Sequence, residues 1–400
     1  MDLRWPKIVA LLFAASFILI VAVRLNIEQM HLMAGTLVSV PIVAVAAGWL
    51  SLRRISAQRS APATCTEGTP FAVTLTTGNT DWSSRAVLSL RDSVPEWIEV
   101  QGTSEQASGG LSVTYRAVPR RRGLHLLGPA RIEASDPLGI STFHRHCGGQ
   151  HELVVYPTPY LPPEAVPLVS AVLAGAVLAR PKFRGDSTDF DSTREYRDGD
   201  EPRWIHWPST ARRGHLVVVE RSREVDDALL VAVDLRHGTE AGRPPNSTLD
   251  ASARLAAYVS REALQHGVKV GLLAVAAEDL SVPPGRTEAQ HIAILESLAR
   301  MTASCPSPFA DVLQRWLSDI RSPSLSALLF LTSDPDPAVL EVLTPLADRG
   351  TVCCGLLLDD WDSAGQTDRR FPSSKAAAFL RDASAVGIQA AVLKPFAYQP

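Results

Sequence analysis

Two carboxylates stand where buried strands are expected to end. Asp234 closes one hydrophobic run, and Asp334 follows another, Leu325–Leu331. The carboxyl ends of parallel strands share one edge of a sheet, where ligands usually bind. Two such carboxylates could hold a divalent cation, or Asp234 could cap a turn or helix. Arg236 and Gly238 stand two and four places after Asp234, so a positive charge competes with any metal there.

A second group of reactive side chains lies in the short segment Arg194–His215. It gathers acidic, basic and imidazole groups around a Gly-Asp turn: Arg194, Glu195, Arg197, Asp198, Asp200, Arg203, His206 and Arg212. Because arginine pairs well with carboxylates, we interpret the group as an internal salt-bridge network that locks the soluble domains together. The alternative is an enzyme site in which His206 acts as acid and base beside Glu195 and Asp200.

Composition limits the classes of function. The 400 residues carry a formal net charge of −3, which argues against general electrostatic binding of nucleic acid. The five cysteines are odd in number and include no C-x-x-C pair, which predicts reduced thiols. The sequence holds no glycine-rich phosphate loop, no G-x-S-x-G and no H-E-x-x-H. We therefore expect no cofactor and no enzymatic activity.

Residues 1–52 predict a transmembrane helical hairpin. Ile8–Val23 and Leu32–Leu50 are apolar runs, and each approaches the ~20 residues needed to cross a bilayer. Basic residues flank the pair of runs on both sides: Arg4, Lys7, Arg53, Arg54 and Arg59. The predicted location is therefore the plasma membrane, multi-pass, with the soluble domains in the cytoplasm. A cleaved signal peptide is the alternative for the first run.

The rest of the chain predicts an α+β multidomain fold. After a basic linker at 51–62, residues 63–158 alternate apolar and polar residues in short runs, which is typical of a β-sandwich-like domain. Residues 159–226 are expected to hold a linker helix, within 161–180, and the charged segment. Strands and helices alternate over 227–400, which predicts a Rossmann-like α/β domain with a mainly parallel sheet.

Two long motifs in this sequence match a known family pattern. REYRDGDEPRWIHWPSTARRGHLVVVE resembles R-E-Y-x-x-G-D-x-x-R-x-I-x-W-x-x-[ST]-A-R, the pattern of the domain of unknown function 58 family of bacterial membrane proteins. The matching positions include Arg194, Glu195, Tyr196, Gly199, Asp200, Arg203, Trp207 and Arg212. His206 stands where the family usually has Asp. RRRGLHLLGPARIEASDPLGISTF is similar to the family's R-R-G…G-P…D-P-[FL]-G segment.

This resemblance implies a fold and a role. Family members look like a transmembrane hairpin, a β-rich domain and a von Willebrand factor type A-like α/β domain. The metal-ion-dependent adhesion site of that domain uses Asp-x-Ser-x-Ser, a Thr and a later Asp. Asp234 and Asp334 match its two Asp positions, whereas Arg236 and Gly238 replace both Ser, so the domain looks degenerate.

Family genes commonly accompany MoxR-type AAA+ ATPases, which implies such an ATPase as a partner. We expect a non-enzymatic, membrane-anchored protein-interaction or assembly factor whose partner surface lies around Asp234 and Asp334. A divalent-metal-dependent adhesion module at these two carboxylates is the alternative.

Overall fold

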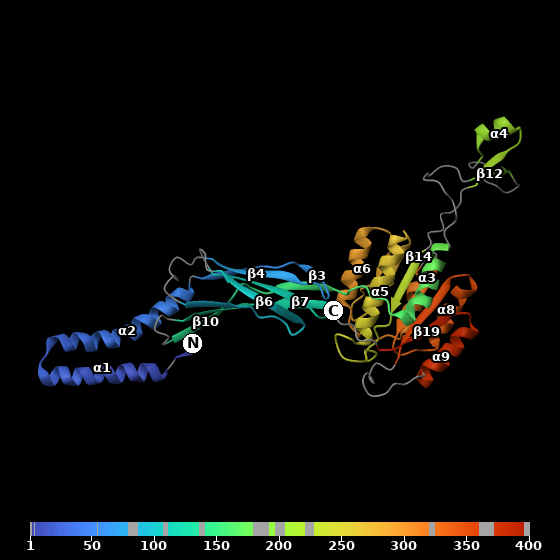
Figure 1. Ribbon diagram of the computed structural model, residues 1–400. Helices are drawn as coiled ribbons and strands as arrows, with labels where there is room; N and C mark the ends of the chain where they lie inside the picture. Colours follow the sequence, from blue (N-terminus) through green and yellow to red (C-terminus); the bar gives the residue numbers. More distant parts are fainter. Residues whose placement is uncertain are drawn as a thin grey trace. The chain divides into compact units, whose positions relative to one another are not determined.

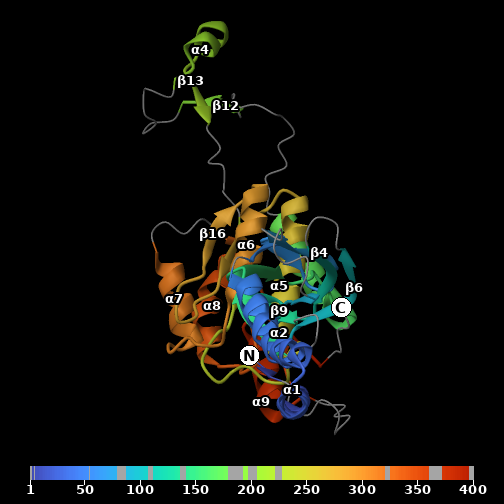
Figure 2. The same cartoon turned by 90° about the vertical axis from the view of Figure 1, so that its left-hand side faces the viewer.

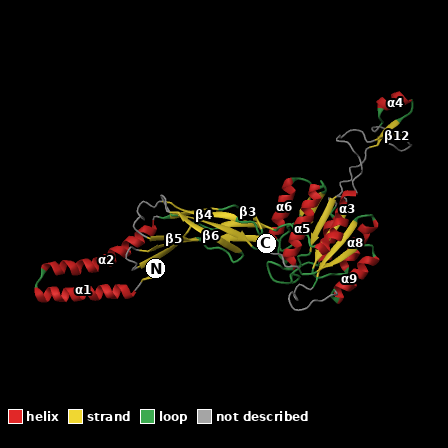
Figure 3. Cartoon of the chain, viewed as in Figure 1, coloured by secondary structure: helices red, strands yellow, loops and turns green. Residues whose placement is uncertain are grey.

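The computed structural model describes residues 2–3, 5–53, 55–78, 87–106, 111–135, 141–178, 192–196, 205–220, 228–319, 325–359 and 372–395. The chain forms two compact units, one up to Thr158 and one from Pro159. Figure 1 labels their elements, and Figure 3 separates helices from strands.

The chain begins with two long apolar helices, α1 (Trp5–Leu25) and α2 (Glu28–Arg53). They lie side by side, as Figure 2 shows end on. Small side chains are buried along them: Ala15, Ala22, Ala34 and Ala44. Both helices are long and apolar enough to cross a membrane, as the apolar runs predicted.

The rest of the first unit consists of three β-sheets. Their strand orders are β1-β10-β9-β5, β2-β4-β7-β6 and β3-β11-β8. The strands are β1 (Asp2–Leu3), β2 (Ser56–Ser60), β3 (Thr64–Thr66), β4 (Phe71–Gly78), β5 (Val87–Arg91), β6 (Ile98–Gln106), β7 (Ser112–Pro119), β8 (Gly123–Leu127), β9 (Ala130–Ser135), β10 (Ser141–Cys147) and β11 (His151–Tyr156). Alternate residues of these strands point into one shared core, for example Val73 and Leu75 from β4, Ile132 from β9 and Leu153 from β11.

The basic linker expected at 51–62 is replaced by regular structure. The last turn of α2 ends at Arg53, and β2 pairs with β4 in the register Ser56↔Gly78. Leu52, Ile55 and Ala57 are buried in the core of the sheets. The sheet-rich region therefore follows the second helix without a spacer.

Arg59 on β2 forms a buried ionic cluster. Its Nη2 lies 2.6 Å from Oδ1 of Asp92, and both side chains are 2% exposed. Arg59 Nη1 donates to the carbonyl of Leu127 at 2.9 Å, and the Tyr115 hydroxyl donates to Asp92 Oδ2 at 2.7 Å. A Cβ on Gly128 would clash with the guanidinium of Arg59, so the cluster requires glycine there.

The second unit is built on a six-stranded sheet of order β16-β15-β14-β17-β18-β19, in which only β16 is antiparallel. The strands are β14 (Ala228–Val233), β15 (Lys269–Leu273), β16 (Val282–Gly285), β17 (Leu325–Thr332), β18 (Val352–Leu358) and β19 (Gln389–Leu393). The helices are η1 (Pro163–Ala165), α3 (Val166–Leu178), α5 (Thr248–Gln265), α6 (Glu288–Arg300), α7 (Phe309–Ser318), α8 (Ala338–Asp348) and α9 (Ser374–Ala385). This alternation confirms the mixed α/β prediction.

The helices cover both faces of this sheet. α5 contacts both α3 and α6 over one face, while α7 and α8 pack together and with α9 cover the other (Figure 1). Buried Leu168, Val169 and Val172 place α3 in the core of this unit. The helix expected within 161–180 is therefore part of the α/β core and not a linker.

Candidate functional site

The edge at which the parallel strands end brings the two predicted carboxylates together. Asp234 follows β14, and its N–H donates to the carbonyl of Leu331 on β17 at 2.9 Å. Asp334 follows the end of that neighbouring strand. The side chain of Asp234 is fully buried, whereas that of Asp334 is 43% exposed.

Arg236 occupies the space between these carboxylates. Its Nε donates to Asp234 Oδ1 at 3.0 Å and its Nη2 donates to Asp234 Oδ2 at 2.8 Å, a two-pronged ion pair. Nη2 also donates to the carbonyl of Asp334 at 2.6 Å, and Nη1 lies 3.5 Å from Asp334 Oδ2. The hydrogen bond to Asp234 is the main cause that raises the pKa of Arg236 above its ordinary value.

Two further side chains complete this cluster. The Thr332 hydroxyl donates to Asp234 Oδ2 at 2.7 Å, and the Asp334 N–H donates to the Thr332 oxygen at 3.1 Å. Lys375, in the first turn of α9, donates to Asp334 Oδ1 and is 61% exposed. We call these residues the carboxyl-edge cluster: Asp234, Arg236, Thr332, Asp334 and Lys375. Its inner half, at Asp234, is buried, and its outer half, at Asp334 and Lys375, is exposed to solvent.

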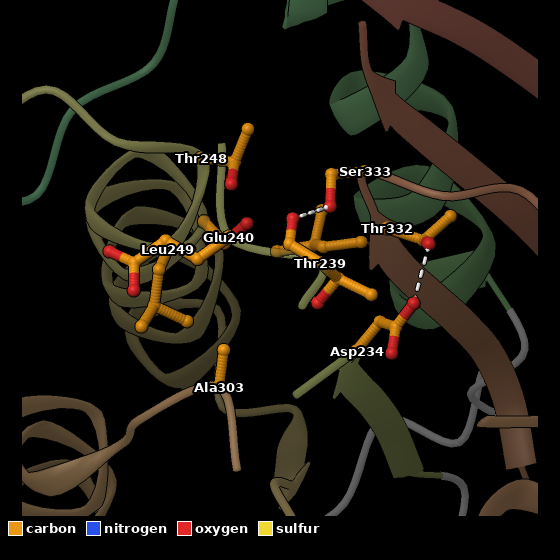
Figure 4. Close-up of a pocket in the computed structure, with 10 residues that line it drawn as sticks. Asp234, Thr239, Glu240, Thr248, Leu249, Ala303, Thr332 and Ser333 are labelled. Atoms are coloured by element: carbon orange, nitrogen blue, oxygen red, sulfur yellow. Dashed lines mark hydrogen bonds between the residues drawn. The ribbon is translucent and has the colours of Figure 1, made fainter. Parts of the chain in front are cut away.

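A small hollow of about 10 Å³ adjoins the buried side of Asp234. Hydroxyls and a second carboxylate line it, and Figure 4 shows Thr239, Glu240, Thr248, Thr332 and Ser333. Ser252 also lines the hollow. The Ser333 hydroxyl donates to the carbonyl of Thr239. A hollow of this size has room for about one water molecule and not for an organic substrate.

The carboxyl-edge cluster does not fit a divalent cation. Both oxygens of Asp234 already accept hydrogen bonds from the guanidinium of Arg236, which places a fixed positive charge where a metal would bind. Among the described residues, no three or more His, Cys, Asp or Glu side chains are grouped to hold a metal ion. The sequence predicted that Arg236 would compete with a metal, and the guanidinium of Arg236 indeed occupies both carboxylate oxygens of Asp234.

Two members of the cluster, Thr332 and Lys375, were not predicted from the sequence. Thr332 ends a strand two residues before Asp334, and that spacing could have indicated it. Lys375 lies on α9, 41 residues after Asp334, which follows β17, so only the tertiary fold brings it to the cluster.

The charged segment folds locally around a short helix. β12 (Ser192–Glu195) pairs antiparallel with β13 (Val217–Glu220), and α4 (Trp207–Arg213) lies between them in sequence. The Tyr196 N–H donates to the carbonyl of Leu216 at 2.9 Å, and Val217 is fully buried. Gly214 ends α4 with φ 74°, a left-handed conformation that favours glycine.

Only part of the predicted charge network falls on described residues. Gly199, Asp200 and Arg203 lie outside them, so the Asp200–Arg203 network stays a prediction. Glu195 Oε1 lies 3.4 Å from His215 Nε2, and both side chains are solvent-exposed. Of the remaining signature positions, Arg194 lies on β12 and Tyr196 follows that strand. Trp207 and Arg212 lie on α4, and Trp207 is 65% exposed.

His206 serves as the N-cap of α4. Its Nδ1 accepts from the Ser209 N–H at 3.3 Å and lies 2.8 Å from the Ser209 hydroxyl. Aspartate is among the preferred N-cap residues, so the imidazole here performs a task that an aspartate could also perform. This arrangement favours a structural role for His206 over acid-base catalysis.

All five cysteines are free, as the sequence predicted, and Cys305, Cys353 and Cys354 are buried. Burial raises the pKa of Cys353 to about 12 and of Cys354 to about 11. These two thiols stay protonated at neutral pH and are poor nucleophiles.

Comparison of the chain with protein families gives a match over part of its length. Residues 192–334 match the model of the family described as "Protein of unknown function DUF58". The matched range contains the charged segment, Asp234, Arg236 and Asp334. No curated protein matches the chain. Among solved structures, a cohesin module from Clostridium perfringens ATCC13124 family 33 glycoside hydrolase is 10% identical, covers 25% of this chain and 96% of its own, and gives a TM-score of 0.17.

Proposed function

We propose that this chain is a non-enzymatic, membrane-anchored protein-interaction factor of the bacterial plasma membrane. α1 and α2 span the bilayer, and the β-sheets of the first unit and the whole second unit lie in the cytoplasm. The observation that supports an interaction role is the carboxyl-edge cluster, in which the buried carboxylate of Asp234 is neutralised by Arg236. Neither a free acid nor an open metal position remains at Asp234 for catalysis.

The outer surfaces of α1 and α2 support membrane anchoring. Large apolar side chains are exposed along both helices, among them Phe13, Phe17, Ile20, Ile42 and Val43. Such a surface is unfavourable in water and favourable in lipid. The length of each helix suits a bilayer.

The strand order supports a degenerate von Willebrand factor type A-like domain. The sheet is parallel except for the edge strand β16, and the carboxylates follow two central strands. In this proposal Arg236 replaces the metal ion, so the domain binds its partner without a divalent cation. Titrating the full chain with Mg²⁺ should therefore give no heat and no stabilisation.

The exposed half of the carboxyl-edge cluster is the proposed partner surface. Lys375 and Asp334 form an ion pair whose side chains are 61% and 43% exposed, so a partner can compete for either charge. The family resemblance favours a MoxR-type AAA+ ATPase as that partner.

The test is capture of partners from native membranes, with and without ATP. Lys375→Glu reverses the exposed charge of the cluster, while Arg349→Glu makes the same change at the exposed C-cap of α8, at the opposite edge of the sheet. We expect an AAA+ ATPase to elute with the wild-type chain and with Arg349→Glu, but not with Lys375→Glu. Equal capture by all three, or capture by none, would overturn the proposal.

A further inference from the structure

We propose that the sheet edge formed by β1 and β10 sits in the phospholipid headgroup layer, with no linker between membrane and β-sheets. The inference rests on the proposed membrane anchoring and adds a lipid-contact surface to it. It follows from the way both apolar helices join the first unit.

The C-terminal turns of α2 belong to the core of the sheets. Leu52 is 6% exposed and packs in the same core as the strands. A Cβ on Gly48 would lie 3.1 Å from two ring carbons of Phe143 on β10. Arg145, also on β10, donates from Nη1 to the Leu52 carbonyl at 3.2 Å. One continuous helix therefore runs from the apolar hairpin into the folded unit.

The N-terminus is attached to the same strand. β1 pairs with β10 in the register Asp2↔Thr142 and Leu3↔Ser141, and α1 begins at Trp5. Both helices thus leave the unit at the β1–β10 edge.

Helix length places this edge relative to the bilayer. The 21 residues of α1 span about 30 Å, which equals the hydrocarbon thickness of a typical bilayer, about 30 Å. Trp5 must then lie at the boundary, where tryptophan is favoured, and both Trp5 and Trp49 are exposed. Leu3 is within about 7 Å of Trp5 along the chain, so its partner Ser141 lies within the headgroup layer.

Three positions on β10 allow the distance from the lipid headgroups to be compared along the strand. Thr142, His144 and His146 alternate along the strand on one face, and consecutive members are about 7 Å apart. They run away from the β1 pairing, so their distance from the headgroups should increase in that order. Thr69, an exposed turn residue hydrogen-bonded to Thr66, belongs to the opposite end of the unit and is the control.

The experiment uses the full chain in phosphatidylcholine–phosphatidylglycerol vesicles. Thr142→Cys, His144→Cys, His146→Cys and Thr69→Cys are labelled with a fluorophore, each in a background carrying Cys65→Ser and Cys147→Ser. A lipid with a nitroxide on its headgroup is the quencher. We expect strong quenching at position 142, a graded decrease through 144 and 146, and none at 69.

Two outcomes separate this inference from the anchoring on which it rests. If alkaline carbonate extracts the chain from membranes, the anchoring itself is wrong. If the chain stays in the membrane but position 142 is quenched no more than position 69, only the headgroup contact is wrong.

Discussion

Arg236 is the residue that distinguishes this carboxyl edge from a metal site. It lies two positions after Asp234, so its guanidinium reaches back to the carboxylate at 2.8 Å while the backbone turns. The sequence was sufficient to predict the pair of carboxylates and the competing charge, because strand ends and local spacing determine both. It could not predict Lys375, whose position depends on how α9 packs.

Arg236→Met should destabilise the second unit by about 3–5 kcal/mol, because it leaves the fully buried Asp234 carboxylate without its partner. Hydrogen exchange of the β14 and β17 amides in the full chain would measure the loss. Adding Asp234→Asn should recover part of it, since the unpaired charge is removed. If the β14 and β17 amides exchange as slowly in Arg236→Met as in the exposed control Arg349→Met, Arg236 does not stabilise the site.

His206 has a role that its sequence neighbourhood did not reveal. His206→Asp should preserve α4, because either side chain can accept from the Ser209 N–H. His206→Ala should destabilise the helix by about 1 kcal/mol. Hydrogen exchange at the N-terminus of α4 distinguishes the two variants. Equal protection in both would show that the cap contributes nothing.

His125 on β8 gives the first unit a dependence on pH. Burial lowers the pKa of His125 below its ordinary value, and a hydrogen bond to the Arg121 carbonyl partly offsets the shift. The unfolded chain then binds more protons as pH falls below about 6.5, so stability is full above that pH and decreases below it, by up to about 1.4 kcal/mol per pH unit.

Unfolding of the full chain between pH 8 and 5.5, followed by hydrogen exchange of β8, tests this dependence. His125→Gln should flatten the profile, because an amide keeps a donor for the Arg121 carbonyl without titrating. If the pH dependence of stability persists in His125→Gln, it arises from another titratable group.

At the scale of elements, periodicity explains which parts of the fold were predictable. The helices and buried strands of the second unit have long apolar patterns, and these patterns predicted them correctly. β16 was missed because its sequence, Val-Pro-Pro-Gly, looks like a turn and is tolerated only at a sheet edge. β10 was missed because His144, Arg145 and His146 are all exposed, which removes the alternation of a half-buried strand.

The packing of α2 on β10 can be tested with two glycines of the same helix. Gly48→Leu should lower the stability of the first unit by about 1–3 kcal/mol, because the new side chain meets the Phe143 ring. Gly35→Leu is the matched control, since nothing lies within 4 Å of its added Cβ. Thermal unfolding of the detergent-solubilised chain compares them. Equal shifts for both variants would contradict the packing.

At the scale of the whole molecule, the sequence predicted a hairpin followed by separate β-rich and α/β regions. It did not predict that the second apolar helix would end inside the β-sheet core. The apolar run that marks a membrane segment and the apolar face that joins a core have the same composition, so only the contacts of Gly48 and Leu52 distinguish them.

The predicted orientation places the C-terminus in the cytoplasm. A green fluorescent protein fused after Pro400 should therefore be fluorescent, and alkaline phosphatase fused there should be inactive, because the first folds in the cytoplasm and the second requires export. Lys7 and Arg53 supply positive charge at the ends of the hairpin, while its turn holds Arg24 with Glu28. Active phosphatase at the C-terminus would reverse the assignment.

The ion pair of Arg59 with Asp92 has a consequence for biogenesis. Arg59 is synthesised 33 residues before Asp92, so the ribosome delivers it as a free cation just behind α2. In the proposed membrane orientation, it then adds to the positive charge that keeps this end of the hairpin in the cytoplasm. Once Asp92, Tyr115 and Leu127 have also been synthesised and the strands pair, the same guanidinium is buried in the protein interior. A single side chain would thus serve insertion first and folding afterwards, in an order that translation enforces.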